Sequence, residues 1–243
     1  MLNYLKILLL STFLLTAPFI SSSYAQNAYY SNTYDLGDIL TDTAFVSKND
    51  TSSCPGNLTV SIPPGSVIDS VDVEYDMIAL GGGWKSEQRS ELWCISPGGM
   101  REDTAWPGKG NLSGTESYHR TGLIIANGVT GGGDVYFQLH AGRTFGGSGC
   151  GGTFNKVVNG TWTITVYFKS PGLWLGYSTA WDDTGNWYGS AVPDINADVF
   201  IPKIPEGGNF PVISGTVTAV CDTIVIENGA SLTIQNGGSL TSY

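Results

Sequence analysis

The two histidines, His119 and His140, limit the catalytic chemistry that this sequence can carry. Nucleophilic catalysis by a serine needs a histidine and a carboxylate beside it, and no Gly-x-Ser-x-Gly turn surrounds any serine. His119 precedes Arg120 in an expected loop. His140 ends an expected strand, on the face opposite the apolar residues of that strand. Both histidines are therefore expected to be exposed to solvent.

Glycoside hydrolysis needs two carboxylates that face each other across a cleft. Glu87, Glu91, Glu102 and Asp103 supply carboxylates in number, but nothing in their spacing sets such a pair. The sequence therefore predicts a protein that is not an enzyme, with a hydrolase as the third alternative.

Sugar binding is the chemistry that the tryptophans could serve. Trp84, Trp93 and Trp106 lie close to a polar stretch at 87–89, and exposed aromatic rings beside hydrogen-bonding groups make platforms for sugar rings. The competing interpretation places Trp93 on a half-buried strand and uses the other two rings to hold loops together. Both interpretations stay open.

Calcium is the one metal that the residue types favour, because hard oxygen ligands are plentiful in the turns. The candidate ligands are two aspartate pairs, Asp182 with Asp183 and Asp194 with Asp198. No Asp-x-Asp-x-Asp-Gly loop occurs, so solvated turn aspartates are the alternative. No other cofactor is expected.

The chain has four cysteines, Cys54, Cys94, Cys150 and Cys221, and none of them forms a C-x-x-C pair. A zinc site is not expected from this spacing, and a disulfide is expected in an oxidising compartment. Three of the four lie in the first part of the chain, so the bridge is expected there. Cys94 occupies a strand, whereas Cys54 and Cys150 lie in turn-like surroundings, which favours a Cys54–Cys150 bridge without excluding the others.

Residues 54–169 are predicted to fold as a β-sandwich. Apolar and polar residues alternate in 58–62, 71–77 and 162–168, which is the period of half-buried strands, and Gly- and Pro-rich turns separate them. Residues 26–53 have no sustained period and are expected to form a lead-in segment with one edge strand. Residues 170–173 form the expected linker.

Residues 174–243 differ in composition from the preceding region: the first part is rich in aromatic residues and the last part contains a repeat. The segments 226–233 and 234–241 share six of eight residues, and each contains an Asn-Gly turn. Such repeats indicate a small, solenoid-like β-repeat module or a series of tight hairpins. A stacked array needs about three repeats to bury a core. The two units are therefore expected either to begin a longer solenoid or to cap the preceding domain.

Residues 1–25 read as a secretory signal peptide that is cleaved between Ala25 and Gln26. An apolar run over 7–20 follows Lys6, and small residues precede the cut. The run is shorter than the roughly 20 residues of a membrane span, so no stable span is expected after cleavage. The mature chain carries a net charge of −11, which disfavours nucleic acid as a partner. The expected location is secreted or at the cell surface.

The first region resembles the jelly-roll sandwich of the galactose-binding-like superfamily, and within it the P domain of subtilisin-like convertases. The resemblance is carried by Ile62–Val73, by Ser90–Gly99 with its Ser-Pro-Gly-Gly turn, and by Asn159–Val166 with its expected core tryptophan. It implies a jelly-roll fold. The family's Asp-Leu pair is Glu91-Leu92 here, and a role in protein processing is not carried over.

The second region is similar to modules of large bacterial surface proteins that use the type IX secretion route. The similarity rests on Trp181–Trp187, Val192-Pro193, Asp198–Pro202, Phe210–Ile213 and the stretch from Cys221 to Ile234. It implies an adhesive or display role at the cell surface, with an extracellular glycan or protein as partner. Such proteins end in a sorting domain, so a chain ending at Tyr243 is expected to be a truncated parent or a short paralogue. The alternative function is that of a carbohydrate-binding module in a polysaccharide-handling system.

Overall fold

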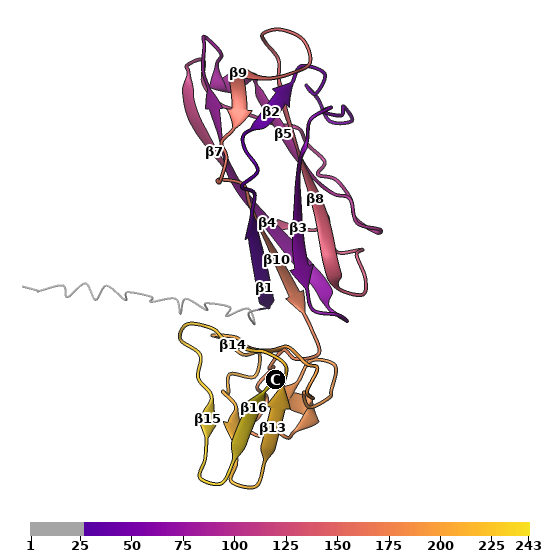
Figure 1. The fold of residues 1–243 in the computed structure, drawn as a ribbon, viewed down its shortest axis with the longest axis vertical. Helices are drawn as coiled ribbons and strands as arrows, with labels where there is room; N and C mark the ends of the chain where they lie inside the picture. The colour runs from indigo at the N-terminus through magenta and orange to yellow at the C-terminus, as the bar shows by residue number, and fades with distance from the viewer. Residues whose placement is uncertain (1–26) are drawn as a thin grey trace, which may run out of the picture.

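The computed structural model describes residues 27–243, so the predicted signal peptide and its cleavage site at Ala25 and Gln26 lie outside the described residues. Sixteen strands and two 3-10 helices, each one turn long, make up the regular structure of this range, and the predicted all-β fold class is confirmed. Figure 1 shows a long body of strands with a smaller body at one end of it. In the described part of the chain no helix has both the length and the apolar character needed to cross a membrane.

The larger body is a β-sandwich whose strands form two layers joined at one end. One layer contains β1 (Ala28–Thr33), β10 (Thr163–Lys169), β4 (Val67–Ala79) and β7 (Gly114–Leu123). The other contains β3 (Gly56–Ile62), β8 (Gly133–Arg143), β5 (Gln88–Cys94) and β6 (Trp106–Pro107). β2 (Ile39–Asp42) and β9 (Cys150–Val157) connect the layers, because β9 pairs with both β4 and β2, and β2 also touches β8. β6 and β7 are therefore the strands at the two edges of the opposite, open side.

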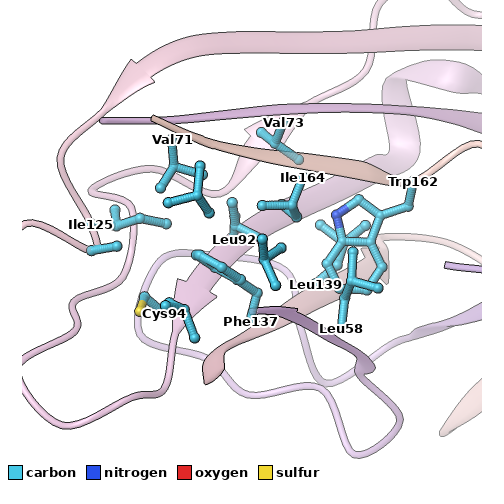
Figure 2. Close-up of a cluster of buried hydrophobic side chains, with 14 of the residues drawn as sticks. Leu58, Val71, Val73, Leu92, Cys94, Ile125, Phe137, Leu139, Trp162 and Ile164 are labelled. Carbon is cyan, nitrogen blue, oxygen red and sulfur yellow. The ribbon is translucent and has the colours of Figure 1, made fainter. Parts of the chain in front are cut away.

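The core between the layers follows the predicted alternation. Val71 and Val73 on β4 and Ile164 on β10 point toward Phe137 and Leu139 on β8 (Figure 2). All five side chains are at most 1% exposed. Burial of each such side chain contributes about 1.5–3 kcal/mol before the entropy of ordering is subtracted, so these strands are fixed in register by their apolar faces.

The segment before the sandwich differs from the expected lead-in. Residues 28–33 form the predicted edge strand, β1, which pairs with β10. Residues 39–42 form a second strand, β2, which lies between β9 and β8 rather than at an edge. The short apolar–polar alternation of Ile39–Asp42 is masked in the sequence by the glycine and aspartates around it.

A disulfide joins Cys54 to Cys150, as the sequence favoured. It ties the start of β3 to the start of β9, two positions 96 residues apart in sequence. Cys94, also named as a disulfide candidate, is instead a free and buried thiol, and Cys221 is free and buried as well. Cys94 was the wrong candidate because its side chain points into the core between the layers, where it is 4% exposed (Figure 2).

The smaller body is a parallel β-solenoid. One coil contains β11 (Val199–Ile201), β12 (Val212–Ile213) and β13 (Thr218–Cys221), and the next contains β14 (Ile224–Ile226), β15 (Thr233–Ile234) and β16 (Ser239–Ser242). Each strand of the second coil pairs in parallel with its counterpart in the first. Isolated parallel bridges from Leu173 to Phe200 and from Ala180 to Val212 begin a further, irregular layer.

The stacking unit of the solenoid is longer than the repeat seen in the sequence. The two eight-residue repeats follow each other along one coil, as its successive sides, and do not stack on each other. The repeats stack instead on residues 21–25 positions earlier, which lack the repeat sequence. Gly237 shows why the corners are glycines: its φ is +90°, and an added Cβ would lie 2.6 Å from the carbonyl oxygen of Gly215 in the coil beneath.

Three tryptophans close the solenoid core. Trp174, Trp181 and Trp187 are each 1% exposed, and the ring of Trp187 lies edge-on to the other two, at centroid distances of 4.9 and 4.8 Å. Leu173 and Phe200 extend from the solenoid into the core of the sandwich. The two bodies therefore share apolar contacts at their junction.

Candidate functional site

A groove lies at the open side of the sandwich, between the edge strands β6 and β7. Its volume is about 540 Å³. Its lining residues come from β6 and the turn after it and from β7: Trp106, Pro107, Lys109, Glu116, Ser117, Tyr118, His119, Arg120, Thr121 and Leu123. An aromatic ring, three charged side chains and several hydroxyl groups therefore converge on one hollow.

Trp106 is the exposed aromatic residue of this groove. It pairs with Ser90 as part of the short strand β6 and remains 42% exposed. Its indole N–H donates to Glu102 Oε1 at 3.1 Å, and the guanidinium of Arg120 lies 5.8 Å from its ring centroid. The ring is thus held in one orientation while much of its surface stays open to solvent.

A buried ion pair supports the floor of the groove. Arg120 Nε donates to Glu102 Oε1 at 2.6 Å and Nη2 donates to Oε2 at 2.9 Å, and both side chains are less than 9% exposed. Arg120 Nη1 also donates to the hydroxyl of Tyr75 at 2.8 Å, and the backbone N–H of Leu92 donates to Glu102 Oε2 at 2.6 Å. Burial alone lowers the pKa of Arg120, but Tyr75 and Glu102 outweigh it and raise that pKa above its usual value.

The ion pair is a rigid element rather than a source of stability. Removal of two charges from water costs several kcal/mol per ion, and a geometry with two parallel hydrogen bonds offsets that cost. Loss of either partner would leave the other charge buried and unpaired, at a cost of about 3–5 kcal/mol. Glu102 and Arg120 therefore act as one unit beneath Trp106.

The β7 side of the groove is supported from outside it by the 3-10 helix η1 (Lys85–Glu87) and by β5. Lys85 Nζ lies 3.1 Å from Glu116 Oε2. The ring of Tyr118 stacks on Tyr75 at 5.0 Å, and its hydroxyl donates to Gln88 Oε1 at 3.0 Å. Burial raises the pKa of Tyr118 well above its usual value, so its hydroxyl stays protonated at any physiological pH.

The three candidate platform tryptophans do not share a surface. Trp84, 47% exposed, precedes η1 and does not line the groove. Trp93 is half-buried on β5, where it stacks on His140 at 3.9 Å. Among these three candidates, the structure brings only Trp106 together with converging polar groups.

The histidines differ from each other. His119 is exposed, as expected, on the outer face of β7, opposite Glu74 in register. His140 is 1% exposed, so the expectation of solvent exposure was wrong. The loop between β2 and β3 covers it: Ser52 N–H donates to His140 Nδ1 at 3.2 Å, and the ring of Phe45 lies 5.9 Å away. Burial lowers the pKa of His140 to about 4.

The carboxylates considered for catalysis have separate roles. Glu87 accepts a hydrogen bond from the backbone N–H of Trp84, and Glu102 is held by Arg120. Glu91 is fully buried, and burial raises its pKa although Trp93 and Arg101 favour its charged form. Asp103 is exposed near Lys48.

The calcium candidates lie in two turns. Asp183 caps the 3-10 helix η2 (Thr184–Asn186) by accepting from the N–H of Gly185 at 3.0 Å, and Asp182 beside it is exposed. Asp194 accepts from the N–H of Asn196 at 2.8 Å, and Asp198 accepts from the hydroxyl of Thr223. Asp194 and Asp198 line a second groove, of about 280 Å³, where the two bodies meet. Calcium binding stays a prediction.

The described residues contain one other arrangement with the donor atoms of a metal site. It joins Asp42 to Cys54 and Cys150, but the two sulfurs are bonded to each other. Asp42 instead accepts hydrogen bonds from the backbone N–H and hydroxyl of Ser53, at 2.7 and 2.6 Å. This arrangement therefore belongs to the disulfide and its loop.

The sequence did not single out the Glu102–Arg120 pair. Glu102 was weighed only as one of several carboxylates, and Arg120 only as the neighbour of His119. Polar residues occupy both faces of β7, so its alternation does not reveal that Tyr118 and Arg120 point inward. A signal that was available is the proximity in sequence of Trp106 and Glu102, four residues apart.

Comparisons with known proteins found a family model that matches part of the chain and several solved structures that are similar to it. Residues 173–242, the solenoid region, match the model of a domain of unknown function, DUF8693. No curated protein matches the chain.

Similar solved structures include a xylan-binding module, CBM15, at 12% identity and a TM-score of 0.35, covering 58% of this chain and 97% of the module. Latent PorU from Porphyromonas gingivalis matches at 8% identity and a TM-score of 0.35, covering 64% of this chain and 14% of PorU. Xylanase10C from Cellvibrio japonicus matches at 11% identity and a TM-score of 0.28, covering 73% of this chain and 32% of the xylanase. At these TM-scores the likenesses assign no function to this chain.

Proposed function

We propose that this protein binds glycans without catalysis and that the groove beside Trp106 is its binding site. The observation that carries the proposal is the exposed, fixed indole of Trp106 in a groove lined by charged and hydroxyl groups. An aromatic-floored groove on the sandwich is the feature expected of a sugar-binding surface, whereas uniformly polar faces would favour a purely structural role.

The geometry of Trp106 suits a sugar ring. The faces of pyranose rings carry C–H groups, which pack on aromatic surfaces, and their edges carry hydroxyl groups that need hydrogen-bond partners. The indole N–H is already satisfied by Glu102, so a sugar stacked on the ring leaves no buried donor unpaired. Because Glu102 and Arg120 hold the ring beforehand, little ordering is required on binding.

Hydrogen-bonding groups for the edges of the sugar are present along β7. Ser117, Thr121 and Glu116 line the same groove as Trp106. The volume of about 540 Å³ lies within the range of roughly 300–1,000 Å³ that is usual for small-ligand sites. The groove lies along the open side of the sandwich, between the edge strands β6 and β7, where a glycan chain can reach it.

The adhesive or display role expected from the sequence fits the same site. A protein that holds a glycan along one side of the sandwich and carries a solenoid at one end of it can link a polysaccharide to whatever the solenoid contacts. The Cys54–Cys150 disulfide is consistent with an extracellular location, since disulfides persist in oxidising compartments.

The test is titration of the purified chain with a panel of plant and bacterial oligosaccharides, followed by tryptophan fluorescence and calorimetry. Trp106→Ala should weaken binding roughly 30-fold or more, because a central aromatic anchor contributes about 2 kcal/mol or more. Trp106→Phe keeps a ring but loses the bond to Glu102, and should have an intermediate effect.

Trp84→Ala is the matched control, since Trp84 is similarly exposed but outside the groove. It should leave the affinity unchanged, and thermal unfolding would show that each variant is folded. A flat response of the wild-type chain to every sugar, or equal losses in the Trp84 and Trp106 variants, would refute the proposal.

A further inference from the structure

The acidic side chains at the Trp106 groove each form an ion pair, and one lysine that lines the groove has no acidic partner. Glu102 is paired with Arg120, and Glu116 is paired with Lys85. Lys109, which lines the groove and is exposed, forms no hydrogen bond or ion pair within the described residues. The groove therefore carries a local positive surplus although the whole chain has a net charge of −10.

Arg89 adds to this surplus from behind the groove. Its Nη1 donates to the carbonyl oxygens of Ser86 and Gln88, at 2.9 and 2.6 Å, and not to a carboxylate. Arg89 is also close enough to the Tyr118 hydroxyl to favour its ionised form. Arg89 therefore forms no direct ion pair with an acid within the described residues.

The guanidinium of Arg120 retains donors for a ligand. A guanidinium has five N–H groups, and Glu102 and Tyr75 accept three of them. The side chain is 8% exposed and lines the groove. Two N–H groups of a nearly buried cation thus remain without an acceptor, which is costly unless water or a ligand supplies one.

Acids of the neighbouring strand β4 also lie close to the groove. Glu74 and Asp76 pair in register with His119 and Ser117, which line the groove. Because His119 faces Glu74, it is not counted among the cations of the groove. The surplus therefore refers to the charged side chains that line the groove together with their ion-pair partners, and among these Lys109 is left without an acid.

Resting on the proposed function, we infer that the glycan bound beside Trp106 is acidic, with a carboxylate that lies against Lys109 and the free N–H groups of Arg120. Trp106, Lys109 and Arg120 line one groove, so a sugar stacked on Trp106 has both cations within the same hollow as its edge substituents. A hexuronate carries its carboxylate on the ring edge and fits this arrangement. Carboxylate and guanidinium form charge-assisted hydrogen bonds, which are about twice as strong as neutral ones.

The experiment compares acids with their own neutral derivatives. Oligomers of galacturonate, of alginate and of glucuronoxylan are titrated by calorimetry, each beside its methyl ester, so that the backbone stays the same and only the charge changes. At least one acid should bind more tightly than its ester, and the ratio should fall as salt is raised from 0.05 to 0.5 M.

Lys109→Gln should weaken binding of the acid about 3- to 5-fold and leave the ester unchanged, since an exposed ion pair contributes up to about 1 kcal/mol. Lys169→Gln removes the same charge from β10, outside the groove, and should change neither affinity. Lys109→Glu should weaken the acid further, to about tenfold.

Failure of the acidic-ligand inference is distinguishable from failure of the proposed function. If every acid binds no more tightly than its ester while Trp106→Ala weakens both, the groove binds neutral glycans and the acidic ligand is wrong. If Lys109→Gln and Lys169→Gln have equal effects on the acid, the attraction is not local to the groove and the inference also falls. If no oligomer of either kind binds, the proposed function itself falls.

Discussion

Strands of the sandwich run for up to thirteen residues, as in β4, whereas those of the solenoid span two to four. The sandwich pairs its strands almost wholly in the antiparallel sense, and the solenoid pairs its coils in parallel. Long strands bury several apolar residues each. In the solenoid, β11 buries three residues, β13 two and β12 one, whereas β14, β15 and β16 bury none. Three tryptophans outside these strands therefore fill much of the solenoid core.

The two bodies also differ in charge and in covalent support. The acidic strand faces and the only disulfide of the described residues lie in the sandwich. Residues 228–243 of the solenoid contain no charged side chain. Cross-linked long strands can hold a buried ion pair such as Glu102–Arg120 in place. A body of short strands with no disulfide is more sensitive to the loss of one large side chain.

The largest effect is expected from Trp187→Ala in the solenoid. The substitution removes a side chain that is 1% exposed and leaves the carbonyl of Trp181 without its donor at 2.7 Å. It should lower the free energy of unfolding by about 5 kcal/mol, the upper end for buried tryptophans. Urea denaturation followed by far-UV circular dichroism measures it.

A pair of milder substitutions sharpens the comparison. Trp187→Phe loses the hydrogen bond to Trp181, whereas Trp162→Phe in the sandwich removes a buried indole N–H that has no acceptor in the described residues. The first should cost about 1–2 kcal/mol more than the second. Equal losses would show that the hydrogen bond of Trp187 adds nothing to packing.

The next effect in size is expected from loss of the disulfide. Cys54→Ser with Cys150→Ser frees a loop of 96 residues, and the chain-entropy model then predicts a loss of about 4.7 kcal/mol in the free energy of unfolding. Reductant should destabilise the wild-type chain by a similar amount and leave the double variant unchanged. An equal effect of reductant on both would place the sensitivity elsewhere than in this bridge.

Much of the sandwich could be predicted because its strands carry a two-residue period with one buried face. The alternation that includes Val71, Val73 and Ile164 predicted strands with one buried face, and hence a sandwich. The turn-like sequence around Cys54 and Cys150 favoured the disulfide between them. Strand β2 was missed because four residues in a polar segment give too short a period. The solenoid was predicted from its eight-residue repeat, but the longer coil that stacks was not. Successive coils have the same backbone path but different sequences, so no repeat of that length is visible.

The site was less predictable than the fold. Trp106 was one of three tryptophans near polar residues, and only the pairing of β6 with β5 separates it from Trp84 and Trp93. Arg120 and Glu102 lie 18 residues apart, on β7 and in the loop before β6. Contacts between edge strands depend on how two layers are joined, and no local pattern in one strand encodes that.

The last prediction separates the two bodies by the pH dependence of their stability. Both histidines lie in the sandwich and none in the solenoid, and burial lowers the pKa of His140 from 6.5 to about 4. Between pH 6.5 and about 4 the imidazole is protonated in the unfolded chain but neutral in the folded protein, so acid favours unfolding. The stability that His140 contributes at neutral pH, about 3 kcal/mol, is therefore lost as pH falls from 6.5 to about 4. Glu91 lies opposite His140 in register and has a raised pKa, so protonation of this buried carboxylate by acid stabilises the fold and opposes the loss.

His140→Asn keeps an acceptor for the N–H of Ser52 and should flatten the decline of stability between pH 6.5 and 4, whereas Glu91→Gln should steepen it. Urea denaturation at pH 7, 6, 5 and 4 measures both slopes, and a His140→Asn slope equal to that of wild type would show that the imidazole is not the titrating group.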